Sequence, residues 1–199
     1  MVFIFFCVSG VLGPMRHHPS LTTREGEPKA IRPLDVDTTL IADALDAYPG
    51  AAVVIANDWP FYYDLEGLRG AGGEFERLIV NVVRTLGGTK QEAVLDFMAG
   101  RTEPFIVIAS QDFEFTEKTA SVRIDIDHKN GFDDAARVSL LQHLRALGEP
   151  AQKPLSEDDV LRASVSGRDL RRAQKLFLPL CASNDAAFQR ELRLLIARG

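Results

Sequence analysis

Consecutive apolar residues mark the expected strands of this chain. Residues 2–7 form an uninterrupted apolar run, and the runs at 51–56 and 104–109 have the same character. Strands that do not alternate between apolar and polar residues are buried on both faces, which is typical of parallel sheets. Residues 120–127 do alternate, which predicts a strand near the edge of the sheet.

Helical spacing of apolar residues occurs between these runs, together with residues that favour helix N-termini. The segment 75–86 fits both patterns, because its apolar residues have helical spacing but include a short β-branched run. We predict a strand there, with a helix as the alternative. Three helices are predicted elsewhere: one capped by Asp37 or Thr38 and ending near Tyr48, one at 90–98, and one capped by Asp133 and ending at Leu147.

Strands that alternate with helices predict an α/β fold. The expected form is a Rossmann-like three-layer sandwich, with a mainly parallel sheet and helices on both faces. In such sheets, ligands bind at the carboxyl ends of the strands. Cys7, Asn57 and Asp112 each lie at or just beyond the end of a predicted strand. We therefore expect these three residues to gather at one edge of the sheet.

The pattern changes near residue 151, beyond which helices are predicted without strands. The sequence thus indicates an α/β domain at residues 1–150 and a helical C-terminal extension at residues 151–199, whose first helix is capped by Ser156. The extension carries 9 Lys and Arg against 6 Asp and Glu, whereas the domain carries 14 against 22. Two interpretations stay open: the extension packs on the domain, or residues 153–199 bind a protein partner or a second copy of the chain.

Composition and charge narrow the classes of function. With 199 residues, 46% apolar and 26% charged, the chain has the composition of a globular protein. Its net charge of −5 gives no whole-chain reason to bind nucleic acid, and no apolar run is long enough to span a bilayer. Two cysteines, Cys7 and Cys181, are too few for a disulfide scaffold. A secretion signal has Lys or Arg before its apolar run, whereas the first apolar run of this chain is preceded by neither. We expect a cytoplasmic protein that binds neither membranes nor nucleic acid.

Four segments carry a resemblance to a known family. In chain order, they are FIFFCVSGVLGP, VVIANDWP, TKQEAVLDFM and FIVIASQDF. This ordered set resembles the haloacid dehalogenase-like (HAD) superfamily over residues 2–147, and in particular the small, nearly capless HAD domains found with RNA-repair proteins. The resemblance implies an HAD-like α/β domain with a phosphoryl-transfer site at the ends of its strands.

The resemblance also implies a role for individual residues. In that family, an Asp after the first strand attacks phosphorus and binds Mg²⁺, and a second Asp protonates the leaving group. A Ser or Thr and a Lys hold the phosphoryl oxygens, and a later acidic residue completes the metal site. In this chain, the matching positions are, in the same order, Cys7, Ser9, Asn57, Lys90 and Asp112.

Two of these replacements predict that phosphatase chemistry is lost. Mg²⁺ prefers hard oxygen ligands, so a thiol at Cys7 removes both a nucleophile and a charged metal ligand. The hydroxyl of Ser9 stays protonated at neutral pH, which makes it a poor general acid. We predict a catalytically inactive HAD-like protein that binds a ligand or partner in a regulatory role, with a phosphorylated small molecule as a candidate ligand. The alternative is an active phosphohydrolase with an unorthodox site; no cofactor is expected, except Mg²⁺ at Asp112 if that alternative holds.

The candidate residues also have structural interpretations. Cys7 at the end of a buried strand would be a small core residue, and Lys90 at a helix start would be a solvated surface charge. Asp125 and Asp127 resemble a metal motif, but alternation places both on one face of an edge strand, where we expect them to be solvated. These structural interpretations predict a buried side chain for Cys7 and exposed side chains for Lys90, Asp125 and Asp127.

Overall fold

The computed structural model describes residues 1–7, 11, 38–56, 69, 73–83, 88–110 and 114–165. Within these ranges, five strands form one sheet in the order β3-β2-β1-β4-β5, and every pairing is parallel. The predicted α/β fold of the Rossmann-like sandwich type is therefore confirmed. The strands are β1 (Val2–Phe6), β2 (Ala51–Ala56), β3 (Ile79–Val83), β4 (Phe105–Ser110) and β5 (Arg123–Ile126).

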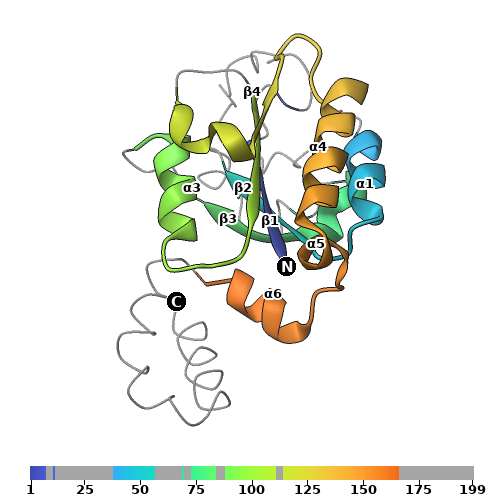
Figure 1. Cartoon of the computed structure of the whole chain (residues 1–199), viewed down its shortest axis with the longest axis vertical. Coiled ribbons are helices and arrows are strands. Elements are labelled where there is room, and N and C mark those ends of the chain that lie inside the picture. The colour runs from blue at the N-terminus through green and yellow to red at the C-terminus, as the bar shows by residue number, and fades with distance from the viewer. Residues whose placement is uncertain are drawn as a thin grey trace, which may run out of the picture.

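Helices cover both faces of this sheet. One face is covered by α1 (Thr39–Asp46) and α4 (Asp134–Leu147), and the other by α3 (Lys90–Met98), as Figure 1 shows. None of the helices in the described ranges is long and apolar enough to cross a membrane. The sheet is thus the middle layer of three.

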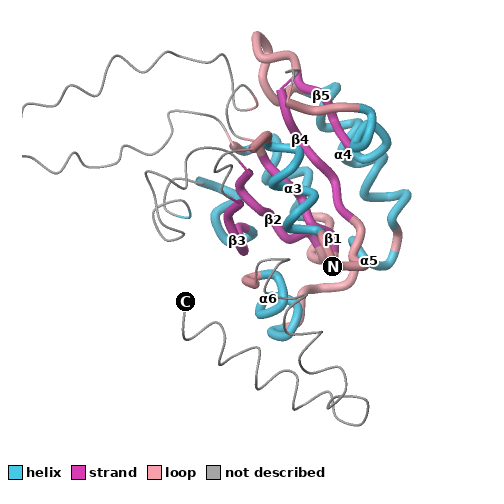
Figure 2. The backbone as a smooth tube through the Cα atoms, turned by 90° about the vertical axis from the view of Figure 1, so that its left-hand side faces the viewer, coloured by secondary structure: helices cyan, strands magenta, loops and turns pink. Residues whose placement is uncertain are grey.

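Four shorter elements complete the described chain. The 3₁₀ helices η2 (Gly73–Leu78) and η3 (Glu117–Val122) directly precede β3 and β5. After α4, the chain forms α5 (Glu149–Gln152) and α6 (Glu157–Ala163). Figures 1 and 2 place α5 and α6 at the end of the sheet where the strands begin.

The two faces of β1 contribute to two separate hydrophobic cores. Val2, Ile4 and Phe6 pack with α1 and α4, whereas Phe3 and Phe5 pack with α3. All five are 0% exposed, because successive side chains of a strand point to opposite faces and both faces are covered. Burial of each such side chain contributes about 2–3 kcal/mol, so the central strand is a major source of stability on both sides.

Most predicted elements are confirmed. The apolar run 51–56 is β2, and the predicted helix 90–98 is α3. Asp133 caps α4 by accepting the Ala136 N–H, as its residue type predicts. Thr38 occupies the N-cap of α1, although its side chain makes no capping hydrogen bond.

Two segments differ from their predictions. Within 75–86, the residues up to Leu78 belong to η2, so the strand begins only at Ile79, where the β-branched run starts. Residues 120–122 belong to η3 and shorten the strand predicted at 120–127, which does lie at the edge of the sheet.

Residues 149–165, called the strap below, cross the edge where the strands begin. Ala151 belongs to the core beneath α4 and Ala163 to the core beneath α3, and both are 0% exposed. The Gly50 N–H donates to Ala151 O at 2.9 Å, and Asn81 Nδ2 donates to Ala163 O at 2.7 Å. The strap therefore packs on the sheet, while the helices predicted beyond residue 165 lie outside the described residues.

Asp159 gives the strap an acid-sensitive contact. As predicted, Ser156 caps α6, and the Asp159 carboxylate accepts the Ser156 hydroxyl at 2.7 Å and the Ser156 N–H at 3.0 Å. The same carboxylate pairs with Arg162 at 2.8 Å. Burial acts to raise the pKa of Asp159, but the hydrogen bonds from Ser156 and the charge of Arg162 outweigh it and lower the pKa to about 2.

We expect Asp159→Asn to weaken the acid dependence of stability. Because the pKa in the folded state lies below the unfolded value, the carboxylate stabilises the fold above about pH 4, and this stabilisation is lost as the pH falls toward 2. Between about pH 5 and about pH 2, the wild-type protein should lose about 1 kcal/mol more than the variant, once solvent screening is allowed for. Urea unfolding measures this difference, and Asp158→Asn in the same turn is the control. Equal acid losses in wild type and Asp159→Asn would contradict the prediction.

Candidate functional site

The chain leaves two neighbouring strands, β1 and β4, toward opposite faces of the sheet. After β1, Val11 is buried in the core beneath α1 and α4, where its carbonyl accepts the Phe132 N–H. After β4, Phe115 is buried in the core beneath α3. Connections that diverge in this way define the topological switch point at which open α/β sheets bind ligands. The candidate site therefore lies at the carboxyl ends of β1 and β4, called the switch-point edge below.

Cys7 is the first residue beyond β1 at this edge. Its N–H donates to Ile108 O at 2.9 Å, which continues the pairing with β4. The residue is 1% exposed and belongs to the same core as Phe5 and Phe97. This is the exposure expected of a small core residue.

Lys90 begins α3 at the same edge and is held by Glu114. Lys90 Nζ lies 3.1 Å from Glu114 Oε1, and the Lys90 N–H donates to Glu114 Oε2 at 2.7 Å. The two side chains are 12% and 24% exposed, so the interpretation of Lys90 as a solvated surface charge is wrong. The helix dipole disfavours a cation at a helix N-terminus, and the Glu114 carboxylate offsets this cost while it satisfies a backbone donor of the first turn. A capping box of Thr89 and Glu92 sets where this turn begins.

Gln91, the next residue of α3, binds the segment that follows β4. Its Oε1 accepts the Thr116 N–H at 2.8 Å and the Thr119 hydroxyl at 3.1 Å, and its Nε2 donates to Thr116 Oγ1 at 3.0 Å. Gln91 is 6% exposed and Thr119 is 0% exposed. A buried amide with both of its ends hydrogen-bonded holds its neighbours in one arrangement. The sequence carries no signal for this contact, because a Gln in an amphipathic helix is normally exposed.

Arg123 extends these contacts to β5. Its guanidinium carbon lies 5.6 Å from the centre of the Phe115 ring. Nη1 donates to Thr116 O at 3.0 Å and to Thr119 Oγ1 at 3.3 Å, and Nε donates to Asp125 Oδ1 at 2.6 Å. The side chain therefore ties η3 to the edge strand of the sheet.

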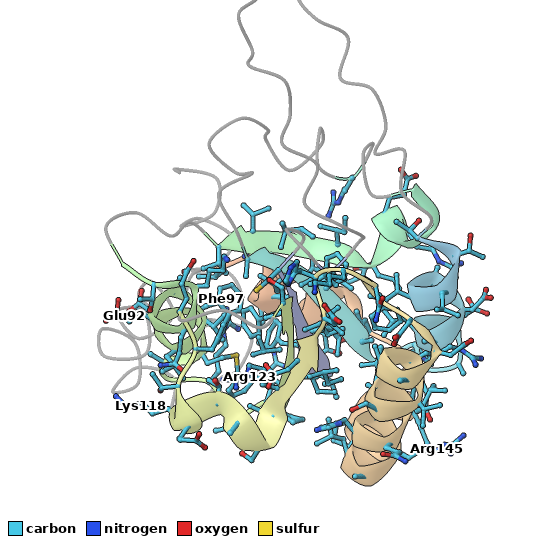
Figure 3. The ribbon with its side chains drawn as sticks, turned by 90° about the horizontal axis from the view of Figure 1, so that it is seen from above. Glu92, Phe97, Lys118, Arg123 and Arg145 are labelled. Carbon is cyan, nitrogen blue, oxygen red and sulfur yellow. The ribbon has the colours of Figure 1, made fainter. Side chains whose placement is uncertain are left out.

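These contacts form one group on the α3 face. Figure 3 shows Arg123 and Lys118 on the same side of the sheet as Phe97 of α3, whereas Arg145 of α4 lies across the sheet. Hydrogen bonds join α3, η3 and β5, so the group fixes one side of the switch-point edge. We call it the polar cluster; its members are Lys90, Gln91, Glu114, Thr116, Thr119 and Arg123.

Asp125 and Asp127 each have a local partner. Asp125 binds Arg123, and Asp127 Oδ1 accepts the Lys129 N–H at 2.9 Å in a turn that reaches Gly131, whose φ is 69°. Their side chains are 40% and 52% exposed, but only Asp125 lies on the edge strand, because β5 ends at Ile126. Across the described ranges, no group of three or more His, Cys, Asp or Glu side chains is placed to hold a metal ion.

Mg²⁺, which the HAD resemblance implies, does not fit the described donors of the switch-point edge. These donors are a thiol in an apolar core and a carboxylate paired with Lys90. Mg²⁺ binds hard oxygen ligands in an octahedral shell that usually includes several waters, so the thiol does not suit such a shell, and the carboxylate would have to give up its pairing with Lys90. Ser9, Asn57 and Asp112 lie outside the described residues, so their gathering beside Cys7 stays a prediction.

No protein-family model, curated protein or solved structure matches this chain.

Proposed function

We propose that this chain is a cytoplasmic HAD-like protein without phosphatase activity, which binds a ligand or a partner in a regulatory role. The burial of Cys7 carries the proposal. The residue at the family's nucleophile position is 1% exposed and lies in an apolar core. A phosphatase nucleophile must reach the phosphorus of a bound substrate, whereas buried structural cysteines are inert.

The state of Lys90 also argues against phosphoryl transfer. The transferred group carries negative charge that must be stabilised by cations and oriented donors. Lys90, at the phosphoryl-binding position of the family pattern, is engaged by Glu114 through both its ammonium group and its N–H. The pair is neutral overall, so its net attraction for a phosphoryl group is small.

The polar cluster supports a binding role. Its buried Gln91 and Thr119 are hydrogen-bonded across α3 and η3, which gives the switch-point edge a fixed side. The HAD resemblance implies a phosphorylated small molecule as one class of ligand, which would have to bind away from the Lys90–Glu114 pair. Residues 151–199 carry 9 Lys and Arg against 6 Asp and Glu, which supports the second mode, in which the part of residues 153–199 beyond the strap, which ends at residue 165, binds a protein partner or another copy of the chain.

Hydrolysis of phosphomonoesters such as p-nitrophenyl phosphate, with Mg²⁺ present, tests the proposal. We expect the wild-type protein to hydrolyse them no faster than a Cys7→Ala variant, because the position holds no carboxylate nucleophile. Thermal unfolding of both proteins verifies that they are folded. Mg²⁺-dependent turnover that is lost in Asp112→Ala would contradict the proposal and favour an active phosphohydrolase.

A further inference from the structure

We propose that Glu114 determines the charge specificity of the switch-point edge, as an internal anion that excludes phosphate and similar anionic ligands from Lys90. This inference rests on the proposed function, because it concerns the ligand that a non-catalytic switch-point edge accepts.

Both carboxylate oxygens of Glu114 contact Lys90. Oε1 lies 3.1 Å from Lys90 Nζ, and Oε2 accepts the Lys90 N–H at 2.7 Å. A phosphoryl group that approached Lys90 would bind through the same two donors, an ammonium group and a backbone N–H. The Glu114 carboxylate and an external anion therefore compete for one place.

Burial and tethering favour Glu114 in this competition. The Lys90 and Glu114 side chains are 12% and 24% exposed, so water and salt screen their attraction less than that of a surface pair. A carboxylate held on the same chain also acts at an effective concentration on the order of millimolar or above. A weakly bound anion such as inorganic phosphate would have to exceed that concentration to displace the Glu114 carboxylate from Lys90.

Gln91 keeps the Glu114 segment in place. Two residues beyond Glu114, the Thr116 N–H donates to Gln91 Oε1 at 2.8 Å, and Thr116 Oγ1 accepts Gln91 Nε2 at 3.0 Å. Phe115, between them, is 9% exposed in the core beneath α3. The backbone beside Glu114 is thus fixed on its C-terminal side, which holds the carboxylate against the Lys90 ammonium and N–H groups.

Titration of the full chain with inorganic phosphate tests the inference, followed through the Lys90 backbone amide in heteronuclear NMR spectra. We expect no saturable shift in the wild-type protein. Glu114→Gln keeps the shape but removes the charge, and should bind phosphate at least about tenfold more tightly than wild type. The gain should vanish in Glu114→Gln combined with Lys90→Met. Glu117→Gln, which removes an exposed acid of η3, is the matched control and should behave as wild type.

The outcomes separate this inference from the proposed function. Saturable phosphate binding at Lys90 in the wild-type protein would overturn the inference whatever the variants do. A gain in Glu114→Gln that survives Lys90→Met would also overturn it. Glu114→Ala replaces the Gln variant if the latter does not fold, with the same expected gain and a rise in the unfolding temperature on adding phosphate. Mg²⁺-dependent phosphomonoester turnover by the wild-type protein would instead overturn the proposed function.

Discussion

Gly50→Ala should lower the free energy of unfolding by about 3 kcal/mol, because backbone atoms of the strap fill the space that a methyl group needs. A Cβ atom at Gly50 would lie 2.3 Å from Pro150 O and 2.7 Å from Lys153 O. Backbone carbonyls cannot rotate aside as a side chain can, so the strap itself would have to move. The Gly50 N–H donates to Ala151 O at 2.9 Å, and its carbonyl accepts the Val2 N–H at 2.8 Å. Movement here therefore also disturbs the start of β1.

Gly88→Ala is the matched control for this prediction. A Cβ atom at Gly88 would lie 2.8 Å from Glu92 Oε2, the end of a flexible side chain that also accepts the Thr89 N–H at 2.9 Å. Gly88→Ala should therefore cost only about 1 kcal/mol, through the capping box of α3. Urea unfolding followed by circular dichroism measures both variants. If Gly50→Ala costs no more than Gly88→Ala, the strap is not packed against Gly50 as described.

The sheet could be predicted from the sequence because the apolar residues of each strand indicate which of its faces are buried. The run at 51–56 is apolar at every position, and a segment of this kind is stable only when both faces are covered. The start of α4 could likewise be predicted from a nearby residue, because the Asp133 side chain accepts the backbone N–H of Ala136, three residues ahead. Contacts within a few residues of sequence were therefore sufficient for these elements.

The strap could be predicted only in part, because its contacts are distant in sequence. The Ser156 cap is local and was predicted, and the structure adds Asp159 as the second residue of its capping box. The contact from Asn81 to Ala163 O joins residues 82 positions apart, and the fit at Gly50 depends on backbone atoms of a segment that follows α4. Neither of these two contacts can be predicted from the hydrophobic periodicity, which indicates only which side of an element is buried.

In the candidate site, too, features local in sequence could be predicted, whereas contacts between distant residues could not. The end of β1 placed Cys7 at the carboxyl edge of the sheet, and the HAD resemblance supplied Lys90 at the start of α3. The partner of Lys90 was not predictable, because Glu114 lies 24 residues away and meets Lys90 only where the chain after β4 folds back onto α3. A lysine at a helix start is usually solvated, so sequence alone favoured the wrong environment.

Arg101→Met should lower the free energy of unfolding by about 3–4 kcal/mol. It should also let α6 open locally at a lower free energy than the strands of the sheet. The Arg101 guanidinium donates to Phe97 O at 3.1 Å and, through two nitrogens, to Arg162 O at 3.2 Å. It also donates to Val165 O. The guanidinium carbon lies 5.0 Å from the centre of the Phe3 ring and 4.5 Å from that of Phe97. One side chain thus binds the ends of α3 and α6 and covers part of the aromatic core.

The charge of Arg101 is essential to this role. Desolvation lowers the pKa of Arg101 to about 10, with Glu103 opposing the shift and Arg162 adding to it, so the group is still a cation at neutral pH. The carbonyls at helix C-termini carry partial negative charge, and a cation there is stabilising. Methionine fills much of the space but leaves the carbonyls of Arg162 and Val165 without this donor, which is why the loss should exceed that of an ordinary surface substitution.

Two variants and two measurements separate this role from simple packing. Arg101→Lys keeps the charge but not the forked donor geometry, so we expect about half of the loss seen with Met. Arg145→Met, at an exposed position in the last turn of α4, should cost less than about 0.5 kcal/mol. Urea unfolding gives the free energies, and amide hydrogen exchange shows where the chain opens. Exchange in α6 should accelerate in Arg101→Met while exchange in α4 does not. Equal losses for Arg101→Met and Arg145→Met, or unchanged exchange in α6, would mean that α6 is held by its buried Ala163 and by Val165 just beyond it rather than by Arg101.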